Sequence, residues 1–232
     1  MKGKLYGIGV GPGDPELLTL KARHLLKECD IVAVPVKKQG EDSVALRIAR
    51  GAVDIPREKI VEFVFPMSKD KTKWEQGHQA AAEELAKLLD AGKTVAMPVL
   101  GDVSIYSTYS YVHKLLLKEG YDVQMVPGVP SFCAGACAAD TAIAEGEEAF
   151  GVIPSVKGME EVEKCLDVFD NLVIMKAGSY MKEIAELLKA RGMEHCATVI
   201  GNVGMAGEYI GPILSDREYG YFTTVIIKSG VL

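Results

Sequence analysis

The stretch "YGIGVGPGDPELLTL", which runs from Tyr6 to Leu20, shows how the first part of the chain is built. It places four glycines and two prolines between an apolar segment and the expected start of a helix. Asp14 suits a helix N-cap and Pro15 suits the first helical position, so we expect a helix over residues 14–29. An apolar segment, a glycine turn and a helix in this order are typical of the first strand-helix unit of an α/β domain.

The spacing of these glycines argues against a dinucleotide-binding loop, which needs G-x-G-x-x-G between a strand and a helix. Counted from Gly7, the third glycine position is Pro12, and counted from Gly9 it is Asp14. A carboxylate at Asp14 would also repel a pyrophosphate at the helix N-terminus. No G-K-[ST] sequence follows, so the Walker A pattern is missing as well. We therefore expect a tight turn that caps a helix and lines a site, and an NAD-dependent α/β oxidoreductase is the alternative enzyme class.

Strand and helix signals alternate through the first half of the chain, which predicts an α/β sheet with a parallel core. The expected strands are 4–11, 30–35, 59–67, 93–102 and 121–128, and the expected helices are 14–29, 43–53, 74–90 and 105–120.

The second half continues the alternation but ends in strands, which predicts a mixed sheet. The last two strands are expected as a pair, around 207–211 and 221–230. We place the domain boundary after the helix that ends at Gly120, which gives domains 1–120 and 121–232. The other expected elements are helices 132–140, 160–169 and 179–192 and strands 149–154, 171–178 and 196–201.

Composition limits the classes of function. The chain has 232 residues, 48% hydrophobic and 25% charged, with a net charge of −6, which argues against a nucleic-acid partner. No signal peptide or membrane-spanning stretch is found, so we expect a cytoplasmic protein. The cysteines are five, scattered and odd in number, and are expected as free thiols, with the C-x-x-x-C pair Cys133 and Cys137 on one helical face. The four histidines form no spaced ligand motif, so we predict no protein-bound metal.

Two later loops share the character of the first. "PVLGDVSIYSTYS", residues 98–110, and "VPGVPSFCAGA", residues 126–136, each follow an expected strand. Open α/β sheets bind ligands at the carboxyl ends of their strands, where Asp102 is either a helix N-cap or a ligand acceptor. Pro127, Gly128 and Pro130 set an unusual backbone path. Three such loops predict a ligand cleft.

The order and spacing of these motifs resemble the tetrapyrrole methyltransferases, S-adenosylmethionine-dependent enzymes that are not Rossmann-like. "GIGVGPGDPELLTLKA", "GDVSIYSTY" and "VPGVPSFCAGA" resemble the family's first three motifs. "LVIMKAGS" and "VIGNVGMAGEYI" fall where the family has its later strand motifs, so the resemblance spans nearly the whole chain. Val103 is a departure, because relatives often carry proline after the Gly-Asp pair. The resemblance implies two α/β domains of the class III S-adenosylmethionine methyltransferase type, with the active site in a cleft between them.

Within the family, "GDVSIYSTYSYVHKLL" together with "LVIMKAGS" is most similar to the precorrin-2 C(20)-methyltransferases, including the form that acts on cobalt-factor II. The implied activity is C-methylation of a tetrapyrrole in cobalamin biosynthesis. Other precorrin methyltransferases, diphthine synthase and the 16S rRNA 2′-O-methyltransferase are alternatives within the family. A non-catalytic nucleotide-binding or interaction module is an alternative outside it.

The resemblance also implies S-adenosyl-L-methionine as cofactor, with S-adenosyl-L-homocysteine as product. Backbone groups of the Gly-Asp loop would hold the methionine part, and the backbone of Lys176 would make a later contact. The loop around Pro12 would line the opposite wall, toward the tetrapyrrole, where glycines let the backbone approach a flat ligand. The implied cofactor-site residues are Pro12, Leu100, Gly101, Asp102, Ile105, Tyr106, Ser131, Phe132, Lys176, Asn202, Thr223 and Thr224.

The substrate side is less defined by the sequence. The carboxylates of a tetrapyrrole need donors, and basic side chains early in the chain are candidates. We name no general base, since an electron-rich meso carbon can attack without one; Asp14 and Asp102 are the nearest acidic candidates. The family implies a homodimer that acts on a small molecule, without nucleic acid or membrane. The candidate donors are Lys37, Lys38, Arg47 and Arg50.

Overall fold

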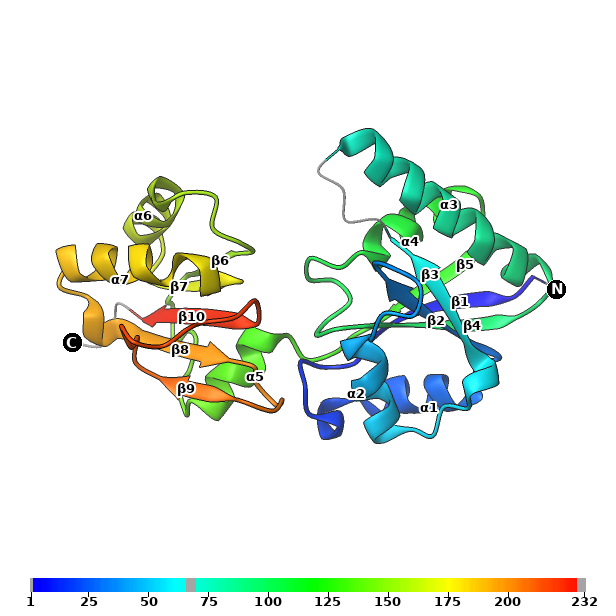
Figure 1. Ribbon diagram of the computed structural model, residues 1–232, viewed down its shortest axis with the longest axis horizontal. Helices are drawn as coiled ribbons and strands as arrows, with labels where there is room; N and C mark the ends of the chain where they lie inside the picture. The colour runs from blue at the N-terminus through cyan, green and yellow to red at the C-terminus, as the bar shows by residue number, and fades with distance from the viewer. Residues whose placement is uncertain (1, 66–69, 229–232) are drawn as a thin grey trace. The chain divides into compact units, whose positions relative to one another are not determined.

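The computed structural model describes residues 2–65 and 70–228. The chain divides into two units, Met1–Pro130 and Ser131–Leu232, each built on one five-stranded sheet in the described part (Figure 1). The division lies at Pro130 rather than at residue 120, because the strand that follows Gly120 pairs with the first strand of the chain.

The sheet of the first unit is parallel throughout, in the order β3-β2-β4-β1-β5. The first strand lies at its centre between β4 and β5. All carboxyl ends therefore lie on one edge of the sheet, as the alternating sequence signals predicted. The strands are β1 (Lys4–Gly9), β2 (Ile31–Val36), β3 (Ile60–Val64), β4 (Thr94–Val99) and β5 (Asp122–Val126).

Helices cover both faces of this sheet, with α1 and α2 on one face and α3 and α4 on the other (Figure 1). Each face has its own core. On the face covered by α1 and α2, Leu26 and Ile48 pack with Ile8. On the face covered by α3 and α4, Leu85 and Leu116 pack with the strand side chains that point to that face. The helices are α1 (Leu20–Glu28), α2 (Val44–Ala52), α3 (Lys71–Asp90) and α4 (Tyr109–Lys118), with 3-10 turns η1 (Pro15–Leu17) and η2 (Arg57–Lys59).

The largest differences at helix starts are in α1 and α4, which both begin later than the sequence predicted. The Asp14 carboxylate accepts a hydrogen bond from the Glu16 N–H at 2.9 Å, but it caps only the short turn η1, and α1 begins at Leu20 with Thr19 as its cap. Helix α4 begins at Tyr109 instead of residue 105. The cause is local, because Tyr106 has a left-handed backbone (φ 49°) that a right-handed helix cannot include.

The sheet of the second unit is mixed, as predicted, in the order β6-β7-β10-β8-β9. Strand β6 is parallel to β7, whereas β10 is antiparallel to both β7 and β8. The expected pairing of the last two strands is wrong. All six residues of β10 are buried, which suits a central position, while the three half-buried residues of β9 form an edge. The strands are β6 (Phe150–Ile153), β7 (Asn171–Met175), β8 (Ala197–Gly201), β9 (Tyr209–Gly211) and β10 (Thr223–Lys228).

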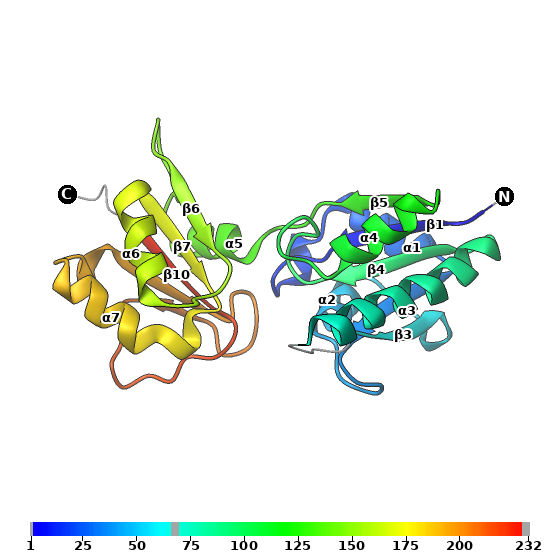
Figure 2. The ribbon, with the colours of Figure 1, turned by 90° about the horizontal axis from the view of Figure 1, so that it is seen from above.

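In the second unit α6 and α7 cover one face of the sheet and α5 covers the other (Figures 1 and 2). The α6/α7 face buries Val225 and Ile227 of the central strand. On the α5 face a Cβ at Gly135 would lie 2.8 Å from the Ile200 side chain, so the glycine lets the helix approach the sheet closely. The helices are α5 (Ser131–Ala138), α6 (Met159–Val168) and α7 (Met181–Ala190), with 3-10 turns η3 (Ala177–Tyr180) and η4 (Glu194–Cys196).

No helix in the described ranges combines the length and apolar character that crossing a membrane would need. None of the five cysteines forms a disulfide.

Candidate functional site

The carboxyl edge of the first sheet brings the three glycine loops together. The loops that follow β1 and β4 form an antiparallel bridge between Gly11 and Gly101. The Gly101 N–H donates to the Gly11 carbonyl at 2.8 Å, and the Gly11 N–H donates back at 3.2 Å. Both glycines have left-handed backbones, with φ of 76° and 73°. The bridge sets the relative position of two of the loops predicted to line a site.

Other glycines of the first unit allow parts of the chain to pack against one another. A Cβ at Gly128 would lie 2.3 Å from the Gly101 carbonyl oxygen, and one at Gly9 would lie 2.6 Å from the Gly128 nitrogen. A Cβ at Gly7 would overlap the buried Tyr109 ring at 2.3 Å. We expected the first glycine loop to allow approach to a flat ligand. The structure shows Gly7, Gly9 and Gly128 in close packing inside the unit, and the approach of the loop around Pro12 to a flat ligand stays a prediction.

Asp102 joins the second loop to the third. Its Oδ2 accepts a hydrogen bond from the Gly128 N–H at 2.7 Å, and its Oδ1 accepts from the N–H and the hydroxyl of Ser104. Burial raises the pKa of the Asp102 carboxyl, but the bonds from Ser104 and the backbone N–H groups of Gly128, Ser104 and Val103 together hold that pKa below its usual value. The carboxylate stays ionised and is engaged by the protein, which disfavours a role as general base. The Asp102 side chain therefore caps the turn at Ser104 and does not cap helix α4.

The six predicted residues of the first unit lie along this edge. Asp102 is buried, with 8% of its surface exposed, and Leu100 and Ile105 are half-buried. Tyr106 is 56% exposed. The six are Pro12, Leu100, Gly101, Asp102, Ile105 and Tyr106.

In the second unit, one end of the central strands carries four of the predicted residues. Lys176 directly follows β7 and Asn202 directly follows β8. Antiparallel β10 begins at the same end, where Thr223 is paired with Gly201 and Thr224 with the last residue of β7. The Asn202 N–H donates to the Phe222 carbonyl at 3.0 Å. Tertiary structure therefore brings together residues that lie far apart in the sequence.

Besides Gly101, three of the predicted residues have left-handed backbones although they carry a side chain. Among non-glycine residues of the described ranges, positive φ occurs at Tyr106, Asp140, Lys176 and Asn202. Such conformations are uncommon for residues with a side chain and concentrate at functional sites. The Lys176 ammonium lies 5.6 Å from the centre of the Tyr221 ring. The left-handed backbones of Tyr106, Lys176 and Asn202 therefore lie at the strand ends where the sequence predicted site residues.

Ser131 and Phe132 form the start of α5, which packs on β10. Phe132 is buried, with 6% of its surface exposed, and Ser131 is half-buried. Both belong to the second unit.

The four basic candidates for substrate carboxylates differ in their surroundings. Arg47 is paired with Asp42, and Arg50 donates to the Ile55 carbonyl at 3.4 Å. Lys37 and its neighbour Lys38 are exposed just beyond β2, on the edge that carries the glycine loops, and have no ion pair within the described residues. The two lysines are therefore better placed than the two arginines to donate hydrogen bonds to a substrate carboxylate.

The sequence did not single out Ser104 as part of the site. Its hydrogen bonds to Asp102 close a local turn, and the pattern of Asp followed two residues later by Ser is a known signal for such turns. The bond from Gly128 could not be foreseen, because it joins residues 26 positions apart. No group of three or more His, Cys, Asp or Glu side chains within the described part is placed to hold a metal ion.

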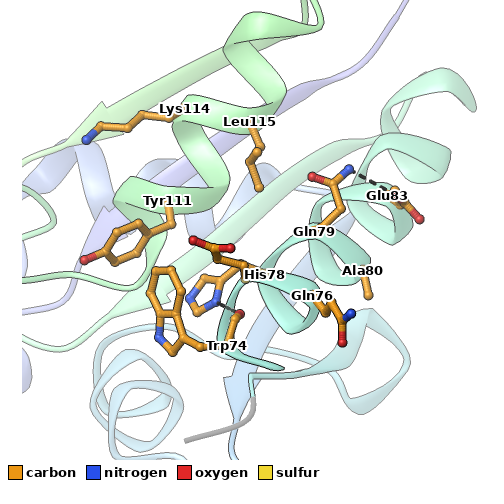
Figure 3. A pocket seen from close by; sticks show the side chains of 10 residues that line it. Trp74, Gln76, His78, Gln79, Ala80, Glu83, Tyr111, Lys114 and Leu115 are labelled. Atoms are coloured by element: carbon orange, nitrogen blue, oxygen red, sulfur yellow. Dashed lines mark hydrogen bonds between the residues drawn. The ribbon is translucent and has the colours of Figure 1, made fainter. Parts of the chain in front are cut away.

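A separate hollow lies between α3 and α4 (Figure 3). It has a volume of about 640 Å³ and includes none of the residues predicted to hold the cofactor. Trp74, His78 and Tyr111 form much of its wall.

Comparison with known proteins connects this geometry to a family. Residues 4–213 match the Tetrapyrrole (Corrin/Porphyrin) Methylases. The chain belongs to the tetrapyrrole methylase family. A probable cobalt-precorrin-2 C(20)-methyltransferase of Methanocaldococcus jannaschii is 40% identical, over 97% of this chain and 96% of that protein. The cobalt-precorrin-2 C(20)-methyltransferase of Salmonella typhimurium is 33% identical, over 98% and 97%.

Solved structures of tetrapyrrole methylases share the fold. A cobalt precorrin-4 methyltransferase superposes with a TM-score of 0.71 at 20% identity, over 97% of this chain and 94% of that one. The uroporphyrin-III-C-methyltransferase of Thermus thermophilus gives 0.66 at 22% identity, over 99% and 93%. These likenesses confirm the fold class predicted from the three loop motifs.

Proposed function

We propose that this tetrapyrrole methylase transfers a methyl group from S-adenosyl-L-methionine to the C(20) meso carbon of precorrin-2 or cobalt-factor II, in cobalamin biosynthesis. The observation that carries the proposal is the near full-length similarity to relatives named for this reaction. A precorrin-2 C(20)-methyltransferase of Sinorhizobium, 28% identical over 97% of this chain, supports the same position of methylation.

The residues present fit a sulfonium cofactor. S-adenosyl-L-methionine, when bound, supplies an electrophilic methyl group on a positively charged sulfur. A buried Asp102 that remains ionised gives the first unit a fixed negative charge, which favours a cation nearby. Half-buried Leu100 and Ile105 offer apolar surface beside it. We assign the tetrapyrrole to the first unit, and we keep the twelve residues predicted from sequence as the proposed cofactor contacts.

The work of the chain in such a reaction is positioning. Methyl transfer is an in-line displacement, so much of the acceleration comes from holding the acceptor carbon and the methyl group in line and away from water. The Gly11–Gly101 bridge and the Asp102–Gly128 hydrogen bond join the three loops of the first unit to one another. We assign Asp102 to loop positioning and to electrostatics, and we expect the proton to leave to water without a protein base.

Incubation with labelled S-adenosyl-L-methionine and either precorrin-2 or cobalt-factor II tests the activity. Mass spectrometry should find one added methyl group, at C(20), on one of the two acceptors. Methylation of neither, with a homologous C(20)-methyltransferase active in the same assay, would contradict the proposal. Calorimetry should show binding of S-adenosyl-L-homocysteine and not of NAD; the reverse result would favour the oxidoreductase class.

Asp102→Ala separates the two roles considered for this residue. We expect weaker S-adenosyl-L-homocysteine binding, because the loop and the negative charge are both disturbed. Asp54→Ala, on the exposed surface after α2, is the control. Unchanged cofactor affinity with lost turnover would instead make Asp102 a residue of the chemical step.

We further propose that the enzyme is a cytoplasmic homodimer that requires neither nucleic acid nor membrane. The family resemblance supports the dimer, and the absence of a membrane-spanning helix in the described ranges agrees with a protein that works without a bilayer. Sedimentation equilibrium at several protein concentrations tests the dimer, and a monomer throughout would refute it. Fractionation of cells that make the protein tests its location.

A further inference from the structure

The hollow between α3 and α4 has the features of a binding site separate from the glycine loops. Its volume of about 640 Å³ falls within the range of small-molecule pockets, roughly 300–1,000 Å³. In Figure 3, Trp74 and His78 of α3 lie next to each other, and the Tyr111 ring of α4 lies beside them. Leu115 also extends from α4 into it. The hollow belongs entirely to the first unit.

Three rings form one wall of this hollow. The Trp74 and Tyr111 rings meet edge to face, with centroids 4.5 Å apart and planes at 90°. The Trp74 ring lies 3.9 Å from the His78 ring, and Tyr111 lies 5.3 Å from it. Tyr111 is 45% exposed and Trp74 is half-buried, so ring surface remains open to a ligand. Aromatic faces attract apolar groups and cations.

His78 supplies an acceptor that the protein leaves unused. The residue is 4% exposed, and its Nδ1 lies 2.8 Å from the Trp74 carbonyl oxygen. A carbonyl oxygen only accepts, so Nδ1 carries the hydrogen and Nε2 of the neutral ring is a bare acceptor. Nε2 is buried and has no hydrogen-bond partner among the described residues. A buried acceptor without a donor is unfavourable, and a ligand N–H would satisfy it.

The charges of the lining favour a cation. Glu75 and Glu83 both line the hollow. Among the described residues, Glu75 has one long contact, with Lys71, at 3.8 Å between exposed side chains. Glu83 accepts a hydrogen bond from the neutral Gln79 amide at 3.0 Å. Lys114 is the opposing charge, but in Figure 3 its side chain extends out from α4, away from His78. Two carboxylates, a bare imidazole nitrogen and ring faces form a set of electron-rich groups.

We propose that this hollow binds an organic ammonium ion with an apolar body. The ammonium group donates a hydrogen bond to His78 Nε2 and is attracted by Glu75 and Glu83, while the apolar body lies against Tyr111 and Leu115. Trp74, in the first turn of α3, covers the His78 ring and is the side chain that moves to admit the ligand. The site is independent of the methyl-transfer proposal.

The chain provides its own probe, because Trp74 is its single tryptophan. Fluorescence of the full chain, excited where the nine tyrosines do not absorb, is measured during titration with benzylammonium. The matched neutral compound is benzyl alcohol. We expect a saturable change in emission with benzylammonium and at least about tenfold weaker binding of benzyl alcohol, which lacks the charge.

Two variants test the assigned groups. His78→Leu, which removes the acceptor, should weaken benzylammonium binding at least about tenfold. Glu83→Gln should weaken it about threefold, since exposed charge pairs contribute modestly. Glu84→Gln, on the same helix but outside the hollow, should bind as the original chain does. Thermal melting identifies loss of fold in His78→Leu, and Glu83→Gln, on the exposed surface, keeps the test decisive in that case.

Three results would overturn the proposal. Equal affinity for benzylammonium and benzyl alcohol would remove the role of charge. Unchanged benzylammonium binding in both His78→Leu and Glu83→Gln would place the probe elsewhere. Trp74 emission that changes with protein concentration and not with either probe would show that a second copy of the chain covers the hollow.

Discussion

The two strand-end edges that carry the predicted site residues combine close glycine contacts and left-handed residues in different proportions. In the first unit, backbone meets backbone: Gly9, Gly101 and Gly128 lie so close together that a side chain on Gly9 or Gly128 would overlap a neighbour. In the second unit a Cβ at Gly178 would likewise lie 2.2 Å from the Gly220 carbonyl oxygen, but residues with side chains hold the left-handed backbone that follows β7 and β8. Lys176 and Asn202 both have left-handed backbones. The loop at Asn202 is joined to the segment before β10 by the hydrogen bond from the Asn202 N–H to the Phe222 carbonyl.

Comparing these positions shows that close backbone approach requires glycine, whereas a left-handed backbone can also be held by a residue with a side chain. Glycine is the sole residue that allows the approach seen between Gly128 and Gly101, because any Cβ would overlap the carbonyl oxygen. A left-handed residue with a side chain is strained but tolerated when its surroundings fix it. The close glycine contacts, Gly128 in the first unit and Gly178 in the second, should therefore be sensitive to any added atom, whereas Lys176 and Asn202 should be sensitive to the kind of side chain.

Gly128→Ala should have the largest effect. The new Cβ would lie 2.3 Å from the Gly101 carbonyl oxygen, so the loops must separate, and we expect a loss of about 3 kcal/mol in the free energy of unfolding. Urea denaturation measures it. Gly158→Ala is the control, since its Cβ meets nothing within 4 Å and its φ of 175° is extended. Equal stability of both variants would show that the first edge adapts easily.

Asp102→Asn should cost about 2 kcal/mol, because charge-assisted hydrogen bonds to Gly128 and Ser104 are weakened or lost. The folded-state pKa of Asp102 lies below its ordinary value of 3.8, so its contribution to stability is present above pH 3.8 and is lost as pH falls through the folded-state pKa. The variant should lose less stability than the original chain over that acidic range. Identical pH profiles from denaturation would contradict this assignment.

Lys176→Val tests the second edge by the kind of side chain. A β-branched residue is disfavoured in the left-handed region, and we expect a loss of about 1.5 kcal/mol. Lys176→Asn removes the same ammonium but tolerates this backbone, so it should stay within about 0.5 kcal/mol of the original chain. Thermal melting compares the two. Equal destabilisation would mean that the ammonium, and not the backbone, carries the effect.

Thr223→Val should have the smallest effect. It removes the hydrogen bond of 2.8 Å from the Thr223 hydroxyl to the Gly220 carbonyl, and water can replace that donor because Gly220 is exposed. We expect a loss of about 0.5 kcal/mol. Denaturation at matched protein concentration checks it. A loss as large as that of Asp102→Asn would show that single side-chain bonds hold the second edge as firmly as the first.

Local signals predicted most of the elements, and tertiary contacts explain the errors. Ser43 and Thr19 act as helix caps, as hydroxyl residues often do, but Asp14 ahead of Pro15 marked a 3-10 turn instead of the α-helix. The position of β10 could not be predicted from its sequence. Its insertion between β7 and β8 depends on partners in β7, from Met175 opposite Thr224 to Asn171 opposite Lys228, which lie roughly fifty or more residues earlier in the chain.

The site was predicted in part, and mostly through motif order. The Gly-Asp loop pointed to Gly101 and Asp102, and the position of a loop after a parallel strand explains why it lies at a ligand edge. The sequence did not distinguish Lys37 from Arg47 as candidate donors. Only the structure shows that Arg47 is paired with Asp42 while Lys37 is exposed and without an ion pair in the described ranges.

By itself, the sequence determined that "YGIGVGPGDPELLTL" opens an α/β unit without the spacing of a dinucleotide loop, because glycine register and helix-start chemistry are local properties. Only the tertiary structure decided what the glycines do. Gly9 makes room for Gly128, and Gly11 forms a bridge with Gly101. Close approach depends on which segments the sheet places side by side, and that pairing is set by packing over the whole unit.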